Sequence, residues 1–249
     1  DTDLSVELTQ GVGGGTSNIQ PAMENGEFDV YPEYTGTAWN MVLMESGVYD
    51  ESMFGELQER YETDSGMSWL GMYGFNNTYG LVVRTEIAEQ YGIETYSDLA
   101  KADENLTFGA EYDFFEREDG YDALCETYGL DFGATMDMDI GLKYQALNQG
   151  EIDVMVIFTT DGQLSTADAV VLLDDKGFFP SYLCGNVVRN EVLEEHPELE
   201  EIFAKLTDTI TDADMAAMNY AVEAEGAEPR DVAMDFLRGH GLLNEEASA

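Results

Sequence analysis

The chain has 249 residues, 44% of them apolar, so it is long enough and apolar enough to fold into one large domain or two lobes. Charge is its outlying property, because 52 acidic residues stand against 10 basic ones and give a formal net charge of −42. Such a surface excludes nucleic-acid binding through general phosphate neutralisation, and it disfavours docking on anionic membranes.

The same charge makes the fold depend on salt. At low ionic strength the carboxylates repel one another and weaken the compact state, whereas molar salt shortens the Debye length to about 3 Å and screens them. Lysine is nearly absent, with four in the chain. The composition therefore indicates a protein from a very salty environment, and an ordinary acidic protein is the alternative.

Strands and helices alternate along the chain, which predicts an α/β protein with mainly parallel strand pairing. A glycine-rich turn at 11–15 leads from the first strand into a helix that Thr16 or Ser17 can cap and Gly26 ends. The predicted strands fall within 4–10, 25–37, 69–84, 106–119, 151–162, 169–175 and 185–189. The predicted helices fall within 16–25, 38–44, 51–63, 85–92, 96–102, 139–150, 191–208, 211–225 and 228–241.

Two weak internal repeats suggest that the chain holds two similar lobes. The first aligns "ENGEFDVYPEYTGT" with "NQGEIDVMVIFTTDG" on Gly26 and Gly150. The second pairs "LVVRTEIAEQ" at 81–90 with "NVVRNEVLEE" at 186–195. Each lobe would then contain a helix, a glycine stop, a strand with an aromatic tip, and a "VVR" strand followed by an acidic helix.

The repeats also predict where the lobes begin and end. If the "VVR" strands mark crossovers, residues 84–184 form one lobe, and residues 1–83 with 185–249 form the other. Ligands in open α/β sheets bind beyond the carboxyl ends of strands. We therefore expect the aligned strand tips, at Tyr34 and Phe158, to face each other across a cleft.

An enzyme is the first class of function to consider, and the residue types offer little for it. His196 and His240 lie in an acidic segment and near the C-terminus, where both have the character of surface residues. No Cys/His cluster has metal-ligand spacing, and Asp137 and Asp139 fit the capping of the next helix better than a hard cation. The sequence therefore predicts no catalytic residue, no cofactor and no metal.

Two other features allow more than one interpretation. The turn at 11–15 lacks the Gly-Lys-Ser/Thr ending of a phosphate loop, but its backbone amides at a helix N-terminus suit a carboxylate. A flexible tight turn is the equal alternative. Cys125 and Cys184 are far apart in sequence, and two cysteines do not make a disulfide framework, so we expect two small buried thiols.

Aromatic residues gather at predicted strand ends and in loops, which favours a binding protein. They are Tyr31, Tyr34, Tyr73, Phe75, Tyr79, Phe158 and Tyr182. Several ring faces around one point bind a cation without a protein counter-charge, and a quaternary ammonium suits them because it has no N–H to donate. An anionic end would need backbone amides or an arginine such as Arg117 in "FFERED". The alternative for Arg117 is an ion pair with its neighbours Glu116 and Glu118.

Several segments together resemble a known family. They are "GEFDVYPEYTGT", "FNNTYGLVVR", "LTFGAEYDFFEREDGY", "DIGLKYQAL", "GEIDV", "TTDG" and "LLDDKGFFPSY", which follow in order along nearly the whole chain. This pattern is similar to the substrate-binding proteins of osmoprotectant ABC importers, the glycine betaine/carnitine/choline-binding group. The resemblance implies a two-lobed, periplasmic-binding-protein-like (type II) α/β fold that closes on a hinge around a ligand held in an aromatic cage.

The resemblance also implies which residues bind the ligand. Carried over by motif, they are Tyr34, Thr37, Tyr79, Phe158 and Tyr182, with Arg117 as the carboxylate-binding group. Phe158 stands where relatives commonly have tyrosine, so it keeps a ring face and loses a hydroxyl. Relatives usually open with a further strand–helix unit carrying a "GSKxFTE"-like turn, and we expect this first unit to be missing from the sequence given.

We therefore expect an extracytoplasmic protein that captures a quaternary ammonium osmoprotectant, glycine betaine first, and delivers it to the membrane permease of an ABC importer. Choline, carnitine or another compatible solute is the alternative ligand. The alternative class is an enzyme on a related two-lobed fold, such as a porphobilinogen deaminase, which would need a cofactor-bearing cysteine and a basic cleft. We expect a monomer at the cell surface, lipid-anchored in its precursor, and the start at Asp1 indicates a mature or trimmed product.

Overall fold

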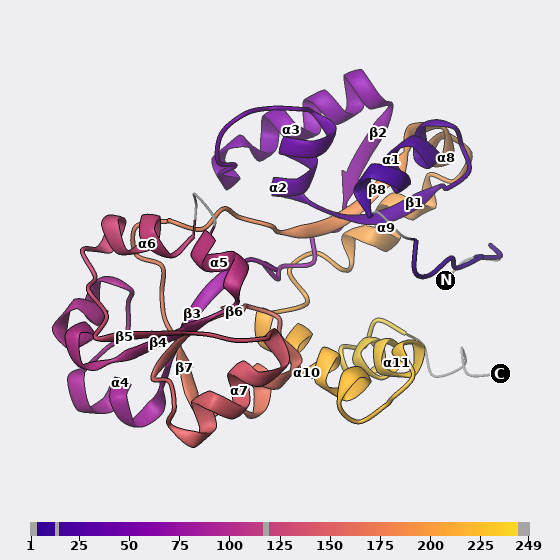
Figure 1. The fold of residues 1–249 in the computed structure, drawn as a ribbon. Helices are drawn as coiled ribbons and strands as arrows, with labels where there is room; N and C mark the ends of the chain where they lie inside the picture. The colour runs from indigo at the N-terminus through magenta and orange to yellow at the C-terminus, as the bar shows by residue number, and fades with distance from the viewer. Residues whose placement is uncertain (1–3, 13–14, 117–119, 244–249) are drawn as a thin grey trace. The chain divides into compact units, whose positions relative to one another are not determined.

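The computed structural model describes residues 4–12, 15–116 and 120–243, which divide into two compact units (Figure 1). Unit 1 consists of Asp1–Asn77, Pro180–Met215 and Ala233–Ala249, and unit 2 of Thr78–Phe179 and Ala216–Val232. The chain thus changes unit slightly before 84 and slightly before 184, and the segment 216–232 belongs with unit 2. The lobe boundaries derived from the sequence stay a prediction.

Unit 1 is built on a three-stranded sheet of order β1-β8-β2. Its elements are α1 (Thr16–Glu24), β1 (Val30–Tyr34), α2 (Thr35–Thr37), the π-helical η1 (Ala38–Val42), the 3₁₀ turn η2 (Glu51–Met53), α3 (Phe54–Arg60), the π-helical η3 (Tyr61–Ser65), β2 (Met67–Leu70), β8 (Cys184–Arg189), α8 (Asn190–Glu195) and α9 (Glu198–Ala204). Tyr31, Val187 and Trp69 form one row across the sheet and are buried in the same core. Because successive side chains of a strand point to opposite faces, Tyr34 lies on the face away from this core.

Unit 2 is built on a five-stranded sheet of order β5-β4-β6-β3-β7. Its elements are β3 (Tyr79–Arg84), α4 (Thr85–Tyr91), the 3₁₀ turns η4 (Ser97–Lys101) and η5 (Asp103–Asn105), β4 (Thr107–Ala110), α5 (Tyr112–Glu116), α6 (Tyr121–Tyr128), β5 (Ala134–Asp137), α7 (Ile140–Gln149), β6 (Val154–Phe158), the 3₁₀ turn η6 (Gly162–Thr166) and β7 (Ala169–Val171). Val154 and Val156 pack with residues of α4, α5 and α6, whereas Met155 and Ile157 pack with α7. The sheet is therefore covered on both faces.

The predicted mainly parallel pairing is wrong for the described strands. β4 runs parallel to β5 and to β6, whereas the pairs β1–β8, β2–β8, β3–β6 and β3–β7 are antiparallel. A crossover helix makes two strands of one sheet parallel. Strands β3 and β8 are the first strands after the chain changes unit. Because no crossover helix among the described residues of their own unit leads into them, they can pair antiparallel.

Other predictions at the N-terminal end need correction. Residues 4–10 form no strand, and Val6 and Leu8 are 83% and 71% exposed. Their alternating pattern is suited to a strand, but a strand also needs a neighbouring strand to take its backbone hydrogen bonds, and no strand within the described residues pairs with this segment. The helix α1 begins at Thr16 with Gly15 in the capping position, so neither Thr16 nor Ser17 caps it. The strands β2 and β5 were not predicted.

The C-terminal part of the chain is helical, as the sequence predicts. After α8 and α9 come α10 (Asp212–Glu223) and α11 (Pro229–Gly239). Within the described ranges, no helix combines the length and apolar character needed to cross a membrane.

The internal repeats correspond to the same strand pairing in both units. In unit 1 β1 pairs with β8, and in unit 2 β6 pairs with β3, both antiparallel. The matching register pairs are Val30 with Val188 and Tyr34 with Cys184 in unit 1, and Val154 with Val83 and Phe158 with Tyr79 in unit 2. Tyr34 and Phe158 are therefore equivalent positions, as the sequence alignment predicts.

Each "VVR" arginine makes the same contacts at the start of this strand pair. In unit 1 the Arg189 Nη2 lies 2.9 Å from the Asp29 Oδ1, and its guanidinium covers Gly26, the left-handed residue that ends the turn after α1. The equivalent residues in unit 2 are Arg84, Asp153 and Gly150, with an arginine–aspartate separation of 3.3 Å. A Cβ at either glycine would lie 3.0–3.2 Å from the guanidinium, so both positions favour glycine for space as well as for positive φ.

Candidate ligand-binding residues in the two units

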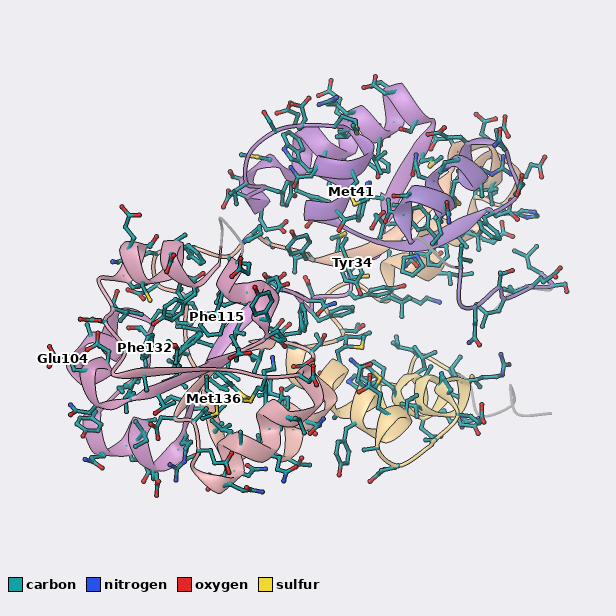
Figure 2. The ribbon with its side chains drawn as sticks, viewed as in Figure 1. Tyr34, Met41, Glu104, Phe115, Phe132 and Met136 are labelled. Carbon is teal, nitrogen blue, oxygen red and sulfur yellow. The ribbon has the colours of Figure 1, made fainter. Side chains whose placement is uncertain are left out.

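Unit 1 carries a group of aromatic rings around the end of β1, where Figure 2 labels Tyr34. The Tyr34 ring meets the edge of Phe75 at a centroid distance of 6.5 Å, and Phe75 stacks on Tyr73 at 6.0 Å. The Tyr73 hydroxyl donates to the Asn186 Oδ1 at 2.7 Å, which fixes this ring on β8. The Tyr34 ring is therefore supported by Phe75, which stacks on the hydrogen-bonded Tyr73.

Tyr182 and Thr37 lie beside the same strand end. The Asn76 Oδ1 accepts from the Tyr182 amide at 2.7 Å. The Tyr182 ring packs against Gly36, where a Cβ would lie 2.8 Å from its Cε1. Thr37 is half-buried and follows Gly36 in α2. Three predicted site residues of unit 1, Tyr34, Thr37 and Tyr182, are thus brought together by the short helix α2.

Replacing Gly36 by alanine tests this close packing. The new Cβ would lie 2.6 Å from the Ser181 carbonyl oxygen, and backbone cannot yield as a side-chain end can. Overpacking of this kind typically costs about 1–3 kcal/mol. We expect Gly36→Ala to lower the melting temperature at high salt, measured by circular dichroism. Gly55→Ala is the matched control because a Cβ there meets no atom within 4 Å, and equal melting temperatures for the two variants would contradict the packing.

A buried carboxylate supports Tyr34 from the core side. Glu33 is 2% exposed and accepts from the Tyr34 amide at 2.7 Å, from the Thr16 hydroxyl at 2.7 Å and from the Tyr31 hydroxyl at 3.1 Å. Burial raises the pKa of the Glu33 carboxyl, and these hydrogen bonds oppose the rise. Tyr31 is 5% exposed and packs in the core of unit 1. The Thr16 side chain at the start of α1 therefore binds the Glu33 carboxylate of the same chain.

Unit 2 carries a second group of rings around Tyr79. Tyr79 at the start of β3 lies opposite Phe158 at the end of β6, with ring centroids 4.7 Å apart. Phe179 and Phe114 lie 5.7 Å and 6.1 Å from Tyr79. Tyr79, Phe158 and Phe179 are half-buried, so the group is packed but retains accessible ring surface.

Phe114 and Phe179 were not among the predicted site residues, although both lie in the motifs "FFERED" and "GFFPSY". Phe179 is held because its amide donates to the Asp174 Oδ2 at 2.9 Å, and Asp174 also accepts from the Tyr128 hydroxyl. The sequence does mark these two residues, because each belongs to a pair of adjacent phenylalanines close to a predicted site residue. Arg117, the predicted carboxylate-binding group, lies outside the described residues.

The features considered for catalysis do not come together. His240 is exposed, and His196 is half-exposed with Glu198 3.6 Å from its Nδ1. Asp139 occupies the capping position of α7 but makes no capping hydrogen bond. Among the described residues no group of three His, Cys, Asp or Glu could hold a metal ion.

Both cysteines are free thiols. Cys184 is buried at the start of β8, and burial raises the pKa of its thiol to about 12. Cys125 is half-buried rather than buried, so the expectation of two buried thiols is met by Cys184 alone.

The fold is that of the two-lobed periplasmic-binding-protein-like class. The chain matches the OpuAC family, "Substrate binding domain of ABC-type glycine betaine transport system", over residues 2–239, and it belongs to that family. A crystal structure of a "glycine betaine/carnitine/choline ABC transporter" superposes with a TM-score of 0.87 at 36% identity, covering 93% of this chain and 86% of the other. These are transport binding proteins, not enzymes.

Two curated relatives differ in the solute that they are named for. The chain is 45% identical over 239 residues to the "Ergothioneine transport permease/ergothioneine binding protein EgtU" of Helicobacter pylori, covering 96% of this chain and 43% of that protein. It is therefore similar to less than half of that relative's length. It is 36% identical over 241 residues to the "Carnitine transport binding protein OpuCC" of Listeria monocytogenes, covering 96% and 78%.

Proposed function

We propose that the protein binds a quaternary ammonium osmoprotectant, with glycine betaine as the first candidate, and delivers it to an ABC permease. The observation that carries the proposal is the pair of aromatic groups at equivalent strand ends, around Tyr34 in unit 1 and Tyr79 in unit 2. Ring faces attract a cation through their quadrupole. A quaternary ammonium suits them because it has no N–H to donate to a carboxylate. The family description supports the same class of solute.

We propose distinct roles for the candidate residues. Tyr34, Tyr79, Phe158 and Tyr182 present ring faces to the cationic head. Thr37 and Arg117 hold the carboxylate, because a hydroxyl and a guanidinium both donate hydrogen bonds to it. The ligand binds more tightly to a closed state of the protein than to an open one.

Three other solutes compete with glycine betaine. Carnitine and ergothioneine also carry a trimethylammonium and a carboxylate, and relatives of this chain are named for them. Choline has the same cationic head and no carboxylate. Its binding energy would therefore come mainly from the rings and little from Arg117.

A titration at high salt tests the proposal. Glycine betaine, proline betaine, carnitine, choline, ergothioneine and proline are titrated by calorimetry against the wild-type protein. We expect saturable binding of at least one methylated ammonium and a much weaker response to proline, whose ammonium keeps its N–H donors. Binding of proline alone, or of none of the methylated solutes, would overturn the proposal.

The cellular setting follows from the class. Binding proteins of ABC importers work outside the cytoplasm, and we propose the same location for this protein, at the cell surface as a lipid-anchored monomer. We also propose that the acidic surface is an adaptation to a very salty environment. Strong charge of one sign keeps a protein soluble when salt screens its repulsion.

A further inference from the structure

A buried lysine lies beside the ring group of unit 2. Lys143 on α7 is 1% exposed, although it is one of four lysines in a chain with 52 acidic residues. A buried ammonium is costly unless it is paired and hydrogen-bonded. A buried lysine in a chain with so few lysines therefore points to a specific function for Lys143.

The ammonium of Lys143 joins two neighbouring strands. Its Nζ donates to the Val156 carbonyl oxygen of β6 at 2.7 Å and forms an ion pair with the Glu111 Oε1 at 2.5 Å. Glu111 is the residue that directly follows β4. Because β4 and β6 are parallel neighbours, Lys143 fixes the carboxyl end of one strand against the other.

The next residue of α7 fixes the turn that follows β6. The Tyr144 hydroxyl donates to the Asp161 Oδ2 at 3.0 Å, and the same oxygen accepts from the Phe158 amide at 3.2 Å. The Asp161 amide donates back to the Phe158 carbonyl oxygen at 3.0 Å. Lys143 and Tyr144 thus anchor the ends of both strands to one helix.

Each anchored strand end carries a ring that contacts Tyr79. Phe158 ends β6, and Phe114 follows Glu111 by three residues and donates its amide to the Glu111 carbonyl oxygen at 3.0 Å. The two rings lie 4.7 Å and 6.1 Å from Tyr79. The separation of these rings therefore depends on how β4 and β6 are held together.

We propose that Lys143 is a positioning residue for the ligand site of unit 2. Its ion pair with Glu111 and its hydrogen bond to Val156 set the geometry of the Tyr79, Phe158 and Phe114 rings without contact to the ligand. This inference rests on the proposed function, because it assigns the ring group to ligand binding. It assigns Lys143 an effect on ligand binding that depends on the position of the rings and not on contact with the ligand.

The first test replaces the ammonium and keeps the chain length. Lys143→Met is expected to weaken glycine betaine binding about tenfold in calorimetry at high salt, at temperatures where its far-ultraviolet circular dichroism is that of the wild type. Lys101→Met is the matched control, since its ammonium is about half exposed and pairs with Asp98 in the same unit. The control is expected to bind within twofold of the wild type. Equal affinity of a folded Lys143→Met and the wild type would overturn the inference.

A double-mutant cycle separates positioning from a general structural effect. If Lys143 acts through the rings, its replacement costs much less affinity in a Phe158→Ala background than in the wild type. The same fold-loss in both backgrounds would overturn the inference. If Lys143→Met does not fold, Glu111→Gln replaces it, because it keeps the shape of the partner and removes the charge. That variant is expected to bind about threefold more weakly, and unchanged affinity would again count against positioning.

A ligand-free readout keeps this inference distinct from the proposed function. With ¹³C-labelled tyrosine, and the Tyr79 signal assigned by Tyr79→Phe, the ring shifts are expected to move in Lys143→Met and to stay in place in Lys101→Met. If the wild type binds none of the solutes, the proposed function fails, whereas the ring shifts still decide whether Lys143 positions the rings. Unmoved Tyr79 shifts in Lys143→Met would overturn the inference by themselves.

Discussion

Removal of salt is expected to unfold the protein completely. Dialysis from molar potassium chloride into salt-free buffer at pH 7 lengthens the Debye length from about 3 Å to 30 Å or more, so that most surface carboxylates repel one another. With a net charge of −42, this repulsion outweighs a typical stability of about 5–15 kcal/mol. Far-ultraviolet circular dichroism should show the loss of helical signal, and readdition of salt should restore it.

Two controls identify the cause as charge repulsion. Sucrose at equal osmolarity carries no ions, so it should not replace the salt. Lowering the pH toward the sequence isoelectric point of about 4.1 removes net charge, so it should reduce the amount of salt that folding requires. A circular dichroism spectrum that is unchanged in salt-free buffer would contradict the prediction.

Replacement of Tyr79 by alanine is expected to weaken glycine betaine binding by about 1–2 kcal/mol or more, the scale of a desolvated cation–π contact. Tyr79 is the ring that joins the candidate group of unit 2, since Phe114, Phe158 and Phe179 all contact it. Its loss removes one ring face and the ring that Phe158 packs against. Calorimetry at high salt measures the effect.

The variant Tyr79→Phe is the matched control for this experiment. It keeps the ring and removes the hydroxyl, so we expect it to retain most of the affinity. If Tyr79→Ala binds as tightly as the wild type, Tyr79 does not contact the cation. If Tyr79→Phe loses as much as Tyr79→Ala, the hydroxyl rather than the ring face carries the interaction.

The candidate site residues could be selected from the sequence because they lie in short motifs at strand ends. The alignment of two glycine stops placed Tyr34 opposite Phe158, and the structure gives both the same place in an antiparallel pair. Tyr31 and Tyr34 point to opposite faces of β1, since side chains alternate along a strand. Arg117 stays a prediction from the motif that contains it.

Other parts of the site depend on residues far apart in sequence. Phe179 reaches Tyr79 in a loop that Asp174 holds by a hydrogen bond, and Lys143 of α7 pairs with Glu111 at the end of β4. No local pattern marks these contacts. The segment 4–10 illustrates the reverse case, since its local pattern favours a strand but none of the described strands pairs with it.

By itself, the sequence determined the charge, the alternation of strands and helices, the internal repeat and the membership of a solute-binding family, because composition and short motifs carry these properties. Only the tertiary structure decided that most of the described strand pairs are antiparallel, which rings meet Tyr79, and that Lys143 of α7 is buried and paired with Glu111. The reason is physical. Backbone ladders, ring contacts and buried ion pairs gain their free energy between segments that are distant along the chain, so their geometry is set when the sheet assembles.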